Sequence, residues 1–407
     1  MTTMPVGLLR RLPLVGLVLV LVAELPLLIP PPFPLTDHLV FWEAGRMVAS
    51  GASPYDMGIW TDVARAYQSG HLLPFVDAGR PVWVYPAWTA FLFVPFGVLP
   101  YPVGPRVLHL AYLAVGLFAA VLFVRSLPAR WQPSAELAIV LVAAFQPLLI
   151  ADRYGQFGSF LLLGLVLVYR GLRDRAVIPL VAGALLLFTK PQLFVVVAAV
   201  VLGLLIWRRD RRAIVTVCAT LLLVATATTL RYPESLSFFR GGVSERVSVY
   251  FGMYSSTWAF AQFFVGAWWP IAGALLVAGA ALMCAAAVRS LPADLRDAGL
   301  IAAAAVFSLA ITPVDFHYDQ PPLVLALILA VAVGRRPYQI ALTLALAAVM
   351  PWFVFFIALG LGSPESQALS GVVPLLVAVL FAVATIGASP ATIPSSPASA
   401  NTAAKLK

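Results

Sequence analysis

Residues 103–125 read VGPRVLHLAYLAVGLFAAVLFVR, an apolar run interrupted only by Arg106 and His109 and closed by Arg125. A helix of about 20 apolar residues is long enough to cross the hydrocarbon core of a bilayer, so this run predicts a membrane span. Similar runs recur to the C-terminus, and 62% of the 407 residues are hydrophobic while 11% are charged. Soluble domains carry about 25% charged residues. The sequence therefore predicts an all-α, polytopic membrane protein.

Working outward from this run, we expect about twelve spans, several of them short enough to suggest helices packed around a cavity. They lie at 12–30, 103–125, 135–151, 156–170, 176–189, 192–207, 213–230, 265–289, 298–313, 320–334, 338–357 and 371–388. The first run follows Arg10-Arg11 and is long, without a small-x-small cleavage site, so we interpret it as a retained signal anchor. Cys218 and Cys284 both fall in apolar spans, which argues against a disulfide framework.

The connectors between these runs alternate in charge, and one set holds most of the 26 Lys and Arg residues. Its members are Arg10-Arg11, Arg125/Arg130, Arg170/Arg173/Arg175, Arg208-Arg209/Arg211-Arg212, Arg289/Arg296, Arg335-Arg336 and Lys405/Lys407. Cytoplasmic connectors carry an excess of Lys and Arg, so we predict that this side, and both termini, are cytoplasmic. The net charge of +9 then reflects membrane topology, and no nucleic-acid partner is expected.

Residues 84–100 (VYPAWTAFLFVPFGVLP) are apolar enough to span, but a span here would invert every later connector. Its prolines also disfavour a straight helix. We therefore expect interfacial helices within a large first external loop, residues 31–102. Residues 1–388 are predicted to form one transmembrane domain with a second external loop at 231–264, followed by a disordered cytoplasmic tail at 389–407 that is rich in Ser, Pro and Ala.

With this topology, five polar segments fall on the outer side of the membrane, which suggests one site there. They are Asp37 in the first loop, Asp152–Gln156, Thr189–Gln192, the loop 231–257 and Thr312–Asp319. Thr36 is placed to N-cap a helix whose first turn holds Asp37. Asp37 is either part of that helix start or a base at the membrane surface.

Several short motifs occur in an order that resembles a known family. They are Asp37 after the first span, Gly51-Ala52-Ser53-Pro54-Tyr55-Asp56, Tyr85-Pro86 to Leu99-Pro100, Gly155-Gln156 and Lys190-Pro191. In this order they resemble glycosyltransferase family 87 of the GT-C superfamily, whose best-known members are polyprenyl-phosphate-mannose-dependent mannosyltransferases. The resemblance covers about residues 5 to 390.

The resemblance implies a GT-C-type bundle in the plasma membrane with an extracytoplasmic active site. It implies transfer of a sugar, with mannose as the first candidate, from a polyprenyl-phosphate-sugar donor to a lipid or glycan acceptor. The transfer would invert the anomeric centre and use no cofactor or nucleotide sugar. An Asp in the first external loop is the proposed general base of this superfamily, and Asp37 matches it.

Cations are expected at the departing phosphate of such a donor. Lys190 lies between two apolar spans, where a lone Lys usually has a function, although it could instead reach the lipid headgroups. Arg106 and Arg153 are further candidates, with anchoring of a helix at the interface as the alternative. His317, between Asp315 and Asp319, is expected to hydrogen-bond the phosphate or the acceptor, with a metal ligand or a structural loop as alternatives.

Three more residues are assigned to substrate binding. Tyr154 and Gln156 either contact the sugar or cap the following span, and Asp319 is placed to orient His317. Asp56 is interpreted as a turn residue. The chain has no Asp-x-Asp cluster and no Walker-type loop, so we expect no metal site.

Other classes of function stay open from the sequence. A transporter or flippase of lipid-linked sugars also needs charged groups inside a helical bundle, although inverted repeats are not evident. A structural membrane subunit, or a ligase or polymerase acting on lipid-linked glycans, are further alternatives.

Overall fold

The computed structural model describes residues 35–236, 254–313, 315–334 and 337–386. The regular secondary structure of this part of the chain is helical, without a β-strand. The expected span at 12–30 and the expected tail at 389–407 lie outside the described residues, as do residues 237–253 of the second loop.

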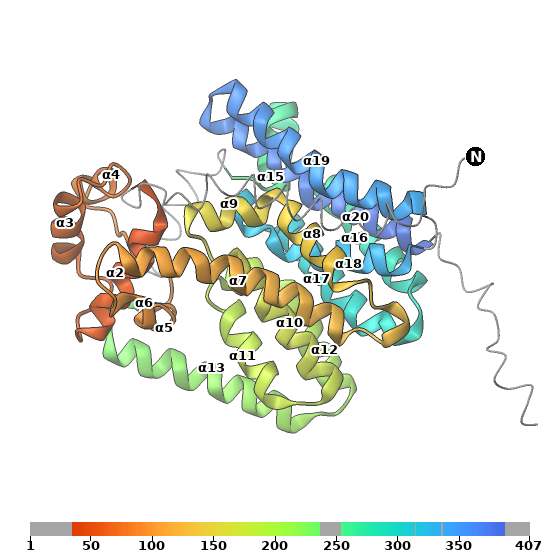
Figure 1. The fold of residues 1–407 in the computed structure, drawn as a ribbon, viewed down its shortest axis with the longest axis horizontal. Helices are drawn as coiled ribbons and strands as arrows, with labels where there is room; N and C mark the ends of the chain where they lie inside the picture. Colours follow the sequence, from red (N-terminus) through yellow and green to blue (C-terminus); the bar gives the residue numbers. More distant parts are fainter. Residues whose placement is uncertain (1–34, 237–253, 314, 335–336, 387–407) are drawn as a thin grey trace, which may run out of the picture.

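The first described segment forms a cap of short helices beside the bundle (Figure 1, left). These are α2 (Asp37–Ala49), α3 (Met57–Ala66), α4 (Leu73–Asp77), α5 (Ala87–Phe91) and α6 (Val94–Gly97). Residues 84–100 therefore hold two short helices rather than one continuous span. Pro95 opens α6, where a missing N–H costs little, and Pro86 precedes α5.

Two long segments follow the cap. The helix α7 (Val103–Ser126) is about 36 Å long at 1.5 Å per residue, which exceeds the hydrocarbon thickness. The next expected span, 135–151, is broken: α8 (Ala135–Ala144) and α9 (Gln146–Tyr154) meet at an angle of 63°. Pro147 lies in the first turn of α9, and it cannot continue the hydrogen-bond ladder of a helix that precedes it.

The rest of the bundle is built from helices of very different length. They are α10 (Gly158–Asp174), α11 (Val177–Leu187), α12 (Val195–Trp207), α13 (Arg211–Arg231), α15 (Thr257–Val265), α16 (Trp269–Ser290), α17 (Arg296–Ile311), α18 (Val324–Val333), α19 (Pro337–Leu361) and α20 (Val372–Ile386). The short turns η3 (Pro191–Leu193) and η7 (His317–Asp319) lie between α11 and α12 and after α17.

The centre of the bundle is formed by α10, α17 and α18. Almost every residue of α18 is buried, which is expected of a helix that is apolar on all sides. Around this centre α10 packs on α7 and α11, and α20 packs on α16 and α18. In contrast α13, which runs from the cap along the lower edge in Figure 1, has little buried surface.

Five helical segments among the described residues are long and apolar enough to cross a membrane, and six if the bent pair counts as one span. The chain is thus a multi-pass membrane protein, and the described residues do not confirm the expected twelve spans. Several predicted spans form helices too short to cross alone, namely α11, α12 and the segment Pro321–Val333. The predicted span 265–289 begins earlier than expected, because α15 joins it at Thr257.

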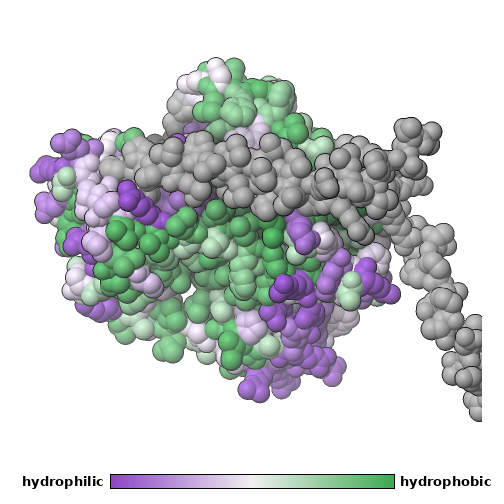
Figure 2. Space-filling view, in the orientation of Figure 1, coloured by the Kyte–Doolittle hydropathy of each residue, from purple (hydrophilic) through white to green (hydrophobic). Residues whose placement is uncertain are grey.

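The surface pattern agrees with a membrane environment. Figure 2 shows apolar surface across the middle of one face, with hydrophilic surface at the left, over the cap, and at the lower right, where α12 and α13 meet. Large apolar side chains such as Leu222, Leu223 and Leu230 of α13 are exposed. Contiguous apolar surface of this kind is rare in soluble monomers and is matched by lipid.

Candidate active site

Five polar side chains from distant segments meet where the cap joins the bundle. Asp37 opens α2, His71 precedes α4, Gln156 follows α9, Lys190 lies between α11 and α12, and Asp319 ends η7. Together they form one hydrogen-bonded chain in the order His71, Asp37, Gln156, Lys190, Asp319.

Both oxygens of the Asp37 carboxylate are engaged. Oδ1 accepts from Nε2 of His71 at 2.7 Å, and Oδ2 accepts from the side-chain amide of Gln156. The Asp37 side chain keeps 23% of its surface exposed. The carboxylate is therefore held in a defined orientation while still reachable from outside.

Gln156 connects this carboxylate to the buried cation. Its amide nitrogen faces Asp37, and its Oε1 accepts from Nζ of Lys190 at 3.2 Å and from the hydroxyl of Tyr85 at 3.4 Å. A side-chain amide can donate on one side and accept on the other, so Gln suits a position between an anion and a cation. Gln156 thereby couples the position of Asp37 to that of Lys190.

The Lys190 ammonium is buried and pairs with a carboxylate: Asp319 Oδ1 lies 2.5 Å from Nζ. The rings of Tyr85, Phe157 and Tyr318 surround Nζ at 5.3–5.7 Å from their centroids, a distance at which cation–π attraction operates. A buried charge is retained only when it is paired and hydrogen-bonded. This environment meets that need and holds the cation beside the cap.

Two glycines allow these segments to approach so closely. Gly155 ends α9 with a φ of +76°, and a Cβ there would lie 2.6 Å from the backbone nitrogen of His38. Gly158 opens α10, and its Cβ would meet Pro321 Cγ at 2.4 Å and the carbonyl of Tyr318 at 2.8 Å. The first contact brings Gln156 to the start of α2, and the second brings it to the segment that carries Asp319.

The motif around Pro54 supports the same site from the cap. The hydroxyl of Tyr55 donates to the carbonyl of Tyr85 at 2.7 Å, and Trp60 donates to the carbonyl of Pro54 at 2.8 Å. Asp56 N-caps α3 by accepting from the amides of Gly58 and Ile59. The turn is thus a brace for Tyr85, whose ring and hydroxyl contact Lys190 and Gln156.

The expected capping role of Thr36 is wrong. Thr36 stands at the N-cap position of α2 but makes no capping hydrogen bond, and its hydroxyl lies 3.1 Å from Nδ1 of His38.

A cavity of about 230 Å³ opens over Asp37. His71, Tyr85, Gln156, Phe316 and Tyr318 are among the side chains that line it. Ligand pockets for drug-sized molecules begin near 300 Å³, so this cavity suits a group about the size of one sugar ring. Aromatic walls with a few convergent polar groups are typical of a ligand site.

The segment after α17 contributes further buried polar groups. Asp315 is fully buried, and burial, followed by the charge of Asp319, raises the pKa of its carboxyl well above the ordinary value. Burial lowers the pKa of His317 to about 4, so this imidazole is neutral at physiological pH. Tyr154 is exposed on one side and contacts the rings of His317 and Tyr318.

Of the site residues predicted from the sequence, Asp37 and Gln156 line the cavity, while Lys190, Tyr154, His317 and Asp319 lie behind or beside its wall and Arg106 and Arg153 are not part of it. Arg106 is exposed in the first turns of α7, and Arg153 is half-buried at the end of α9. His71 was not among the sequence candidates, because it lies in a polar stretch with no motif around it. Its only signal is its place in the same loop as Asp37.

The profile of glycosyltransferase family 87 matches residues 83–313, which is more than half of the chain. This chain belongs to glycosyltransferase family 87. No curated protein and no solved structure matches it.

Family membership establishes a membrane glycosyltransferase, which uses a sugar donor and an acceptor in the membrane. The matched range contains Tyr85, Gln156 and Lys190 but begins after Asp37 and His71 and ends before Asp315. The roles of Asp37, His71 and Asp319 are therefore inferred from the hydrogen bonds that link them to Gln156 and Lys190 in the matched range.

Proposed function

We propose that this protein transfers a sugar, with mannose as the first candidate, from a polyprenyl-phosphate-sugar donor to a lipid or glycan acceptor on the extracytoplasmic face. Asp37 is the general base. It takes the proton of an acceptor hydroxyl, whose oxygen bonds to the anomeric carbon as the bond from that carbon to the phosphate oxygen breaks. The polyprenyl phosphate leaves, and the sugar is bonded to the acceptor with inverted configuration at the anomeric carbon. No metal is assigned to the reacting atoms.

One observation carries this proposal: a carboxylate held at both oxygens opens onto a cavity of sugar size. A general base must lie within hydrogen-bond reach of the proton that it removes. His71 and Gln156 hold Asp37 from two sides, so that its orientation does not have to be established during the reaction. The exposed part of the carboxylate is what an acceptor hydroxyl would approach.

The donor phosphate is assigned to the other end of the hydrogen-bonded chain. Lys190 supplies a positive charge beside the cavity wall, and in our proposal the phosphate shares it with Asp319. Neutral His317 would contribute an N–H donor, and Tyr154 and Tyr318 would contact the sugar. Preorganised donors aimed at developing charge are usually a large part of the rate enhancement.

A second cavity supports a lipid-linked donor. It measures about 400 Å³ and lies among α10, α11, α12 and α13, lined by apolar side chains such as Leu187, Phe194, Val201 and Leu221. Pro191, which directly follows Lys190, is part of its wall. We assign the polyprenyl chain to this cavity, because its apolar wall begins one residue from the proposed phosphate site.

The test is sugar transfer by purified protein from polyprenyl-phosphate-mannose to host lipid extract, with mass spectrometry of the lipids. Asp37→Asn keeps the shape of the side chain but cannot accept a proton, so turnover should fall by about 10²–10⁴-fold. Thermal unfolding in detergent should change little, since Asn suits a helix start about as well as Asp.

Near-normal transfer by Asp37→Asn would remove Asp37 from the mechanism. Transfer by the wild type from a nucleotide sugar instead of the lipid-linked donor would overturn the donor assignment while leaving the base in place.

A further inference from the structure

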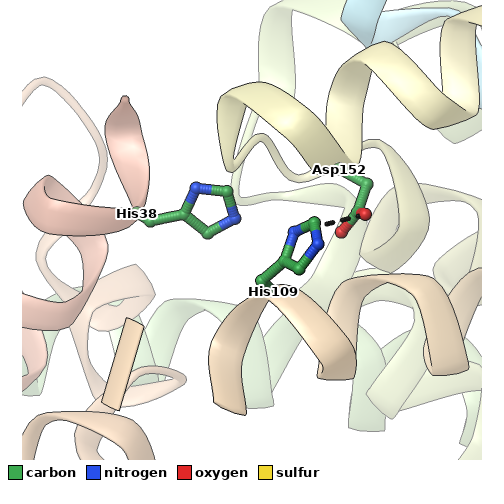
Figure 3. A group of neighbouring side chains, drawn as sticks. All are labelled: His38, His109 and Asp152. Carbon is green, nitrogen blue, oxygen red and sulfur yellow. Dashed lines mark ion pairs between the residues drawn. The ribbon is translucent and has the colours of Figure 1, made fainter. Parts of the chain in front are cut away.

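Three metal-ligating side chains meet directly behind the start of α2. His38 follows Asp37 on α2, His109 lies on α7, and Asp152 lies on α9 (Figure 3). One ligand atom from each falls within 4.8 Å of the other two, and the three residues are exposed by only 0%, 5% and 5%. None of them lines the cavity over Asp37.

An ion pair joins two of these three residues. His109 Nδ1 lies 3.3 Å from Asp152 Oδ2, which accounts for two of the three residues. The ring of His38 also lies edge-on to that of His109, with centroids 5.3 Å apart. Figure 3 shows the His38 ring pointing toward His109 and Asp152. If His109 were charged, this second buried imidazole would face a cation.

Two neighbouring hydroxyls match what a metal site needs. In a histidine that binds a metal through one ring nitrogen, the other ring nitrogen usually forms a hydrogen bond to an oxygen. Thr36 Oγ1 lies 3.1 Å from Nδ1 of His38 and can be that oxygen. Tyr112, one turn after His109, packs edge-on to the His38 ring with its centroid 6.0 Å away. Its hydroxyl is buried without a hydrogen-bond partner among the described residues, and a metal-bound water would supply one.

We propose that His38, His109 and Asp152 bind one divalent transition-metal ion of the zinc type. Two imidazoles and one carboxylate with an open fourth position form a common zinc ligand set, whereas Mg²⁺ and Ca²⁺ prefer oxygen ligands. Metal–ligand bonds of about 2.0–2.2 Å place two ligand atoms of one ion about 3–4 Å apart. The His109–Asp152 pair, at 3.3 Å, already meets this spacing. The ligand atoms that lie farthest apart, within 4.8 Å, would have to approach by about an ångström.

The ion would act on structure rather than on the reacting atoms. It would hold the first turn of α2 against α7 and α9, and the residue next to His38 is Asp37. This inference is independent of the identity of the donor and of the role of Asp37 as a base.

Cobalt(II) is a suitable probe, because it occupies zinc sites and gives visible absorption bands that report its ligands. The full-length protein, purified in detergent and treated with a chelator, is titrated with Co²⁺. We expect one ion per chain, tetrahedral absorption bands, displacement of Co²⁺ by Zn²⁺, and a rise of several degrees in the midpoint of thermal unfolding.

Asp152→Asn and His38→Gln should each weaken Co²⁺ binding by at least tenfold, while His317→Gln, which removes a buried histidine elsewhere, should bind like the wild type. Absence of Co²⁺ bands and of a thermal shift in the wild type would leave an ion pair only and overturn the proposal. Undiminished binding by both ligand variants would place the ion elsewhere and overturn it as well. If one ligand variant does not fold, the other locates the ion, and a wild type that binds no Co²⁺ overturns the proposal in either case.

Discussion

At the scale of single residues, the site depends on side chains that serve two neighbours at once. Gln156 donates to Asp37 and accepts from Lys190, and Asp319 accepts from Lys190 while its second oxygen accepts from the amide of Phe316. Removing one member leaves a buried group without its partner, which costs more than the bond itself. Substitutions here should therefore affect binding and orientation together.

Lys190→Ala should weaken binding of the lipid-linked donor by about tenfold or more, because a charge-assisted contact contributes about 1.5–3 kcal/mol. Lys190→Arg keeps the charge and should retain part of the affinity. Donor titration by isothermal calorimetry in detergent measures both. An unchanged donor affinity together with a lowered turnover would make Lys190 a positioning residue for Gln156 rather than a phosphate ligand.

The raised pKa of the Asp315 carboxyl predicts that the stability of the folded protein depends on pH. Because its pKa is raised in the folded protein, the unfolded chain releases this proton at lower pH than the folded one. The stabilisation is complete below the ordinary pKa of an Asp and is lost progressively as pH rises toward the raised value. Asp315→Asn cannot ionise, so its midpoint of thermal unfolding should fall less than that of the wild type between about pH 5 and about pH 8.

The matched control is Asp56→Asn, an exposed N-cap position where Asn serves equally well. Parallel pH profiles for the wild type and both variants would contradict the assignment of a protonated, buried Asp315.

At the scale of elements, the ends of helices bring the chemistry together. The Phe145 break between α8 and α9 turns α9 by 63°, and the left-handed Gly155 then ends α9 against the first turn of α2. Gly155 is required twice, by its positive φ and by the closeness of the His38 backbone. Gly155 thus lets α9 end close enough to α2 for the side-chain amide of Gln156 to donate to Asp37.

Gly155→Ala should lower sugar transfer markedly and lower the thermal midpoint, because the added Cβ separates α9 from α2 and moves Gln156 away from Asp37. Gly79→Ala is the control: Gly79 also has a positive φ, +63°, but nothing lies within 4 Å of its Cβ position. It should show only the strain of the backbone, about 1 kcal/mol, with normal transfer. Equal losses in the two variants would show that strain alone, and not the helix contact, matters.

At the scale of the whole molecule, the helices divide by length and by environment. Long helices with exposed apolar surface, such as α13 and α16, surround a centre of shorter buried ones, including α10 and α18. A short helix cannot span the bilayer alone, but it can line a cavity within protein. The two cavities described here lie beside such short helices and the loops that join them.

The proposed orientation in the membrane follows from the Arg-rich connectors. In a background with Cys218 and Cys284 replaced by Ala, Ala78→Cys in the first loop should react with a membrane-impermeant maleimide added to intact cells. Arg212→Cys should react only after the membrane is opened. Both positions are exposed in the fold. The reverse pattern would place the cavity over Asp37 on the cytoplasmic side and contradict the extracytoplasmic transfer.

The sequence by itself determined the properties that depend on neighbouring residues. Apolar runs specify helices in a membrane wherever they occur, because burial and backbone hydrogen bonding there are local requirements. The order of short motifs indicated the family, which the profile match confirmed. Asp37, Gln156, Lys190 and Asp319 could be selected because polar groups beside apolar spans are unusual in any fold.

Only the tertiary structure decided which of these side chains touch. Lys190 and Asp319 are 129 positions apart and Gln156 and Asp37 are 119 apart, and no sequence period links them. The pairing of Asp37 with His71 arises because the segment before α4 returns to the start of α2. The cluster of His38, His109 and Asp152 arises from how α2, α7 and α9 pack. That packing depends on the bend at Phe145, the contact at Gly155 and the combined shape of many apolar side chains, and these act between segments rather than within them.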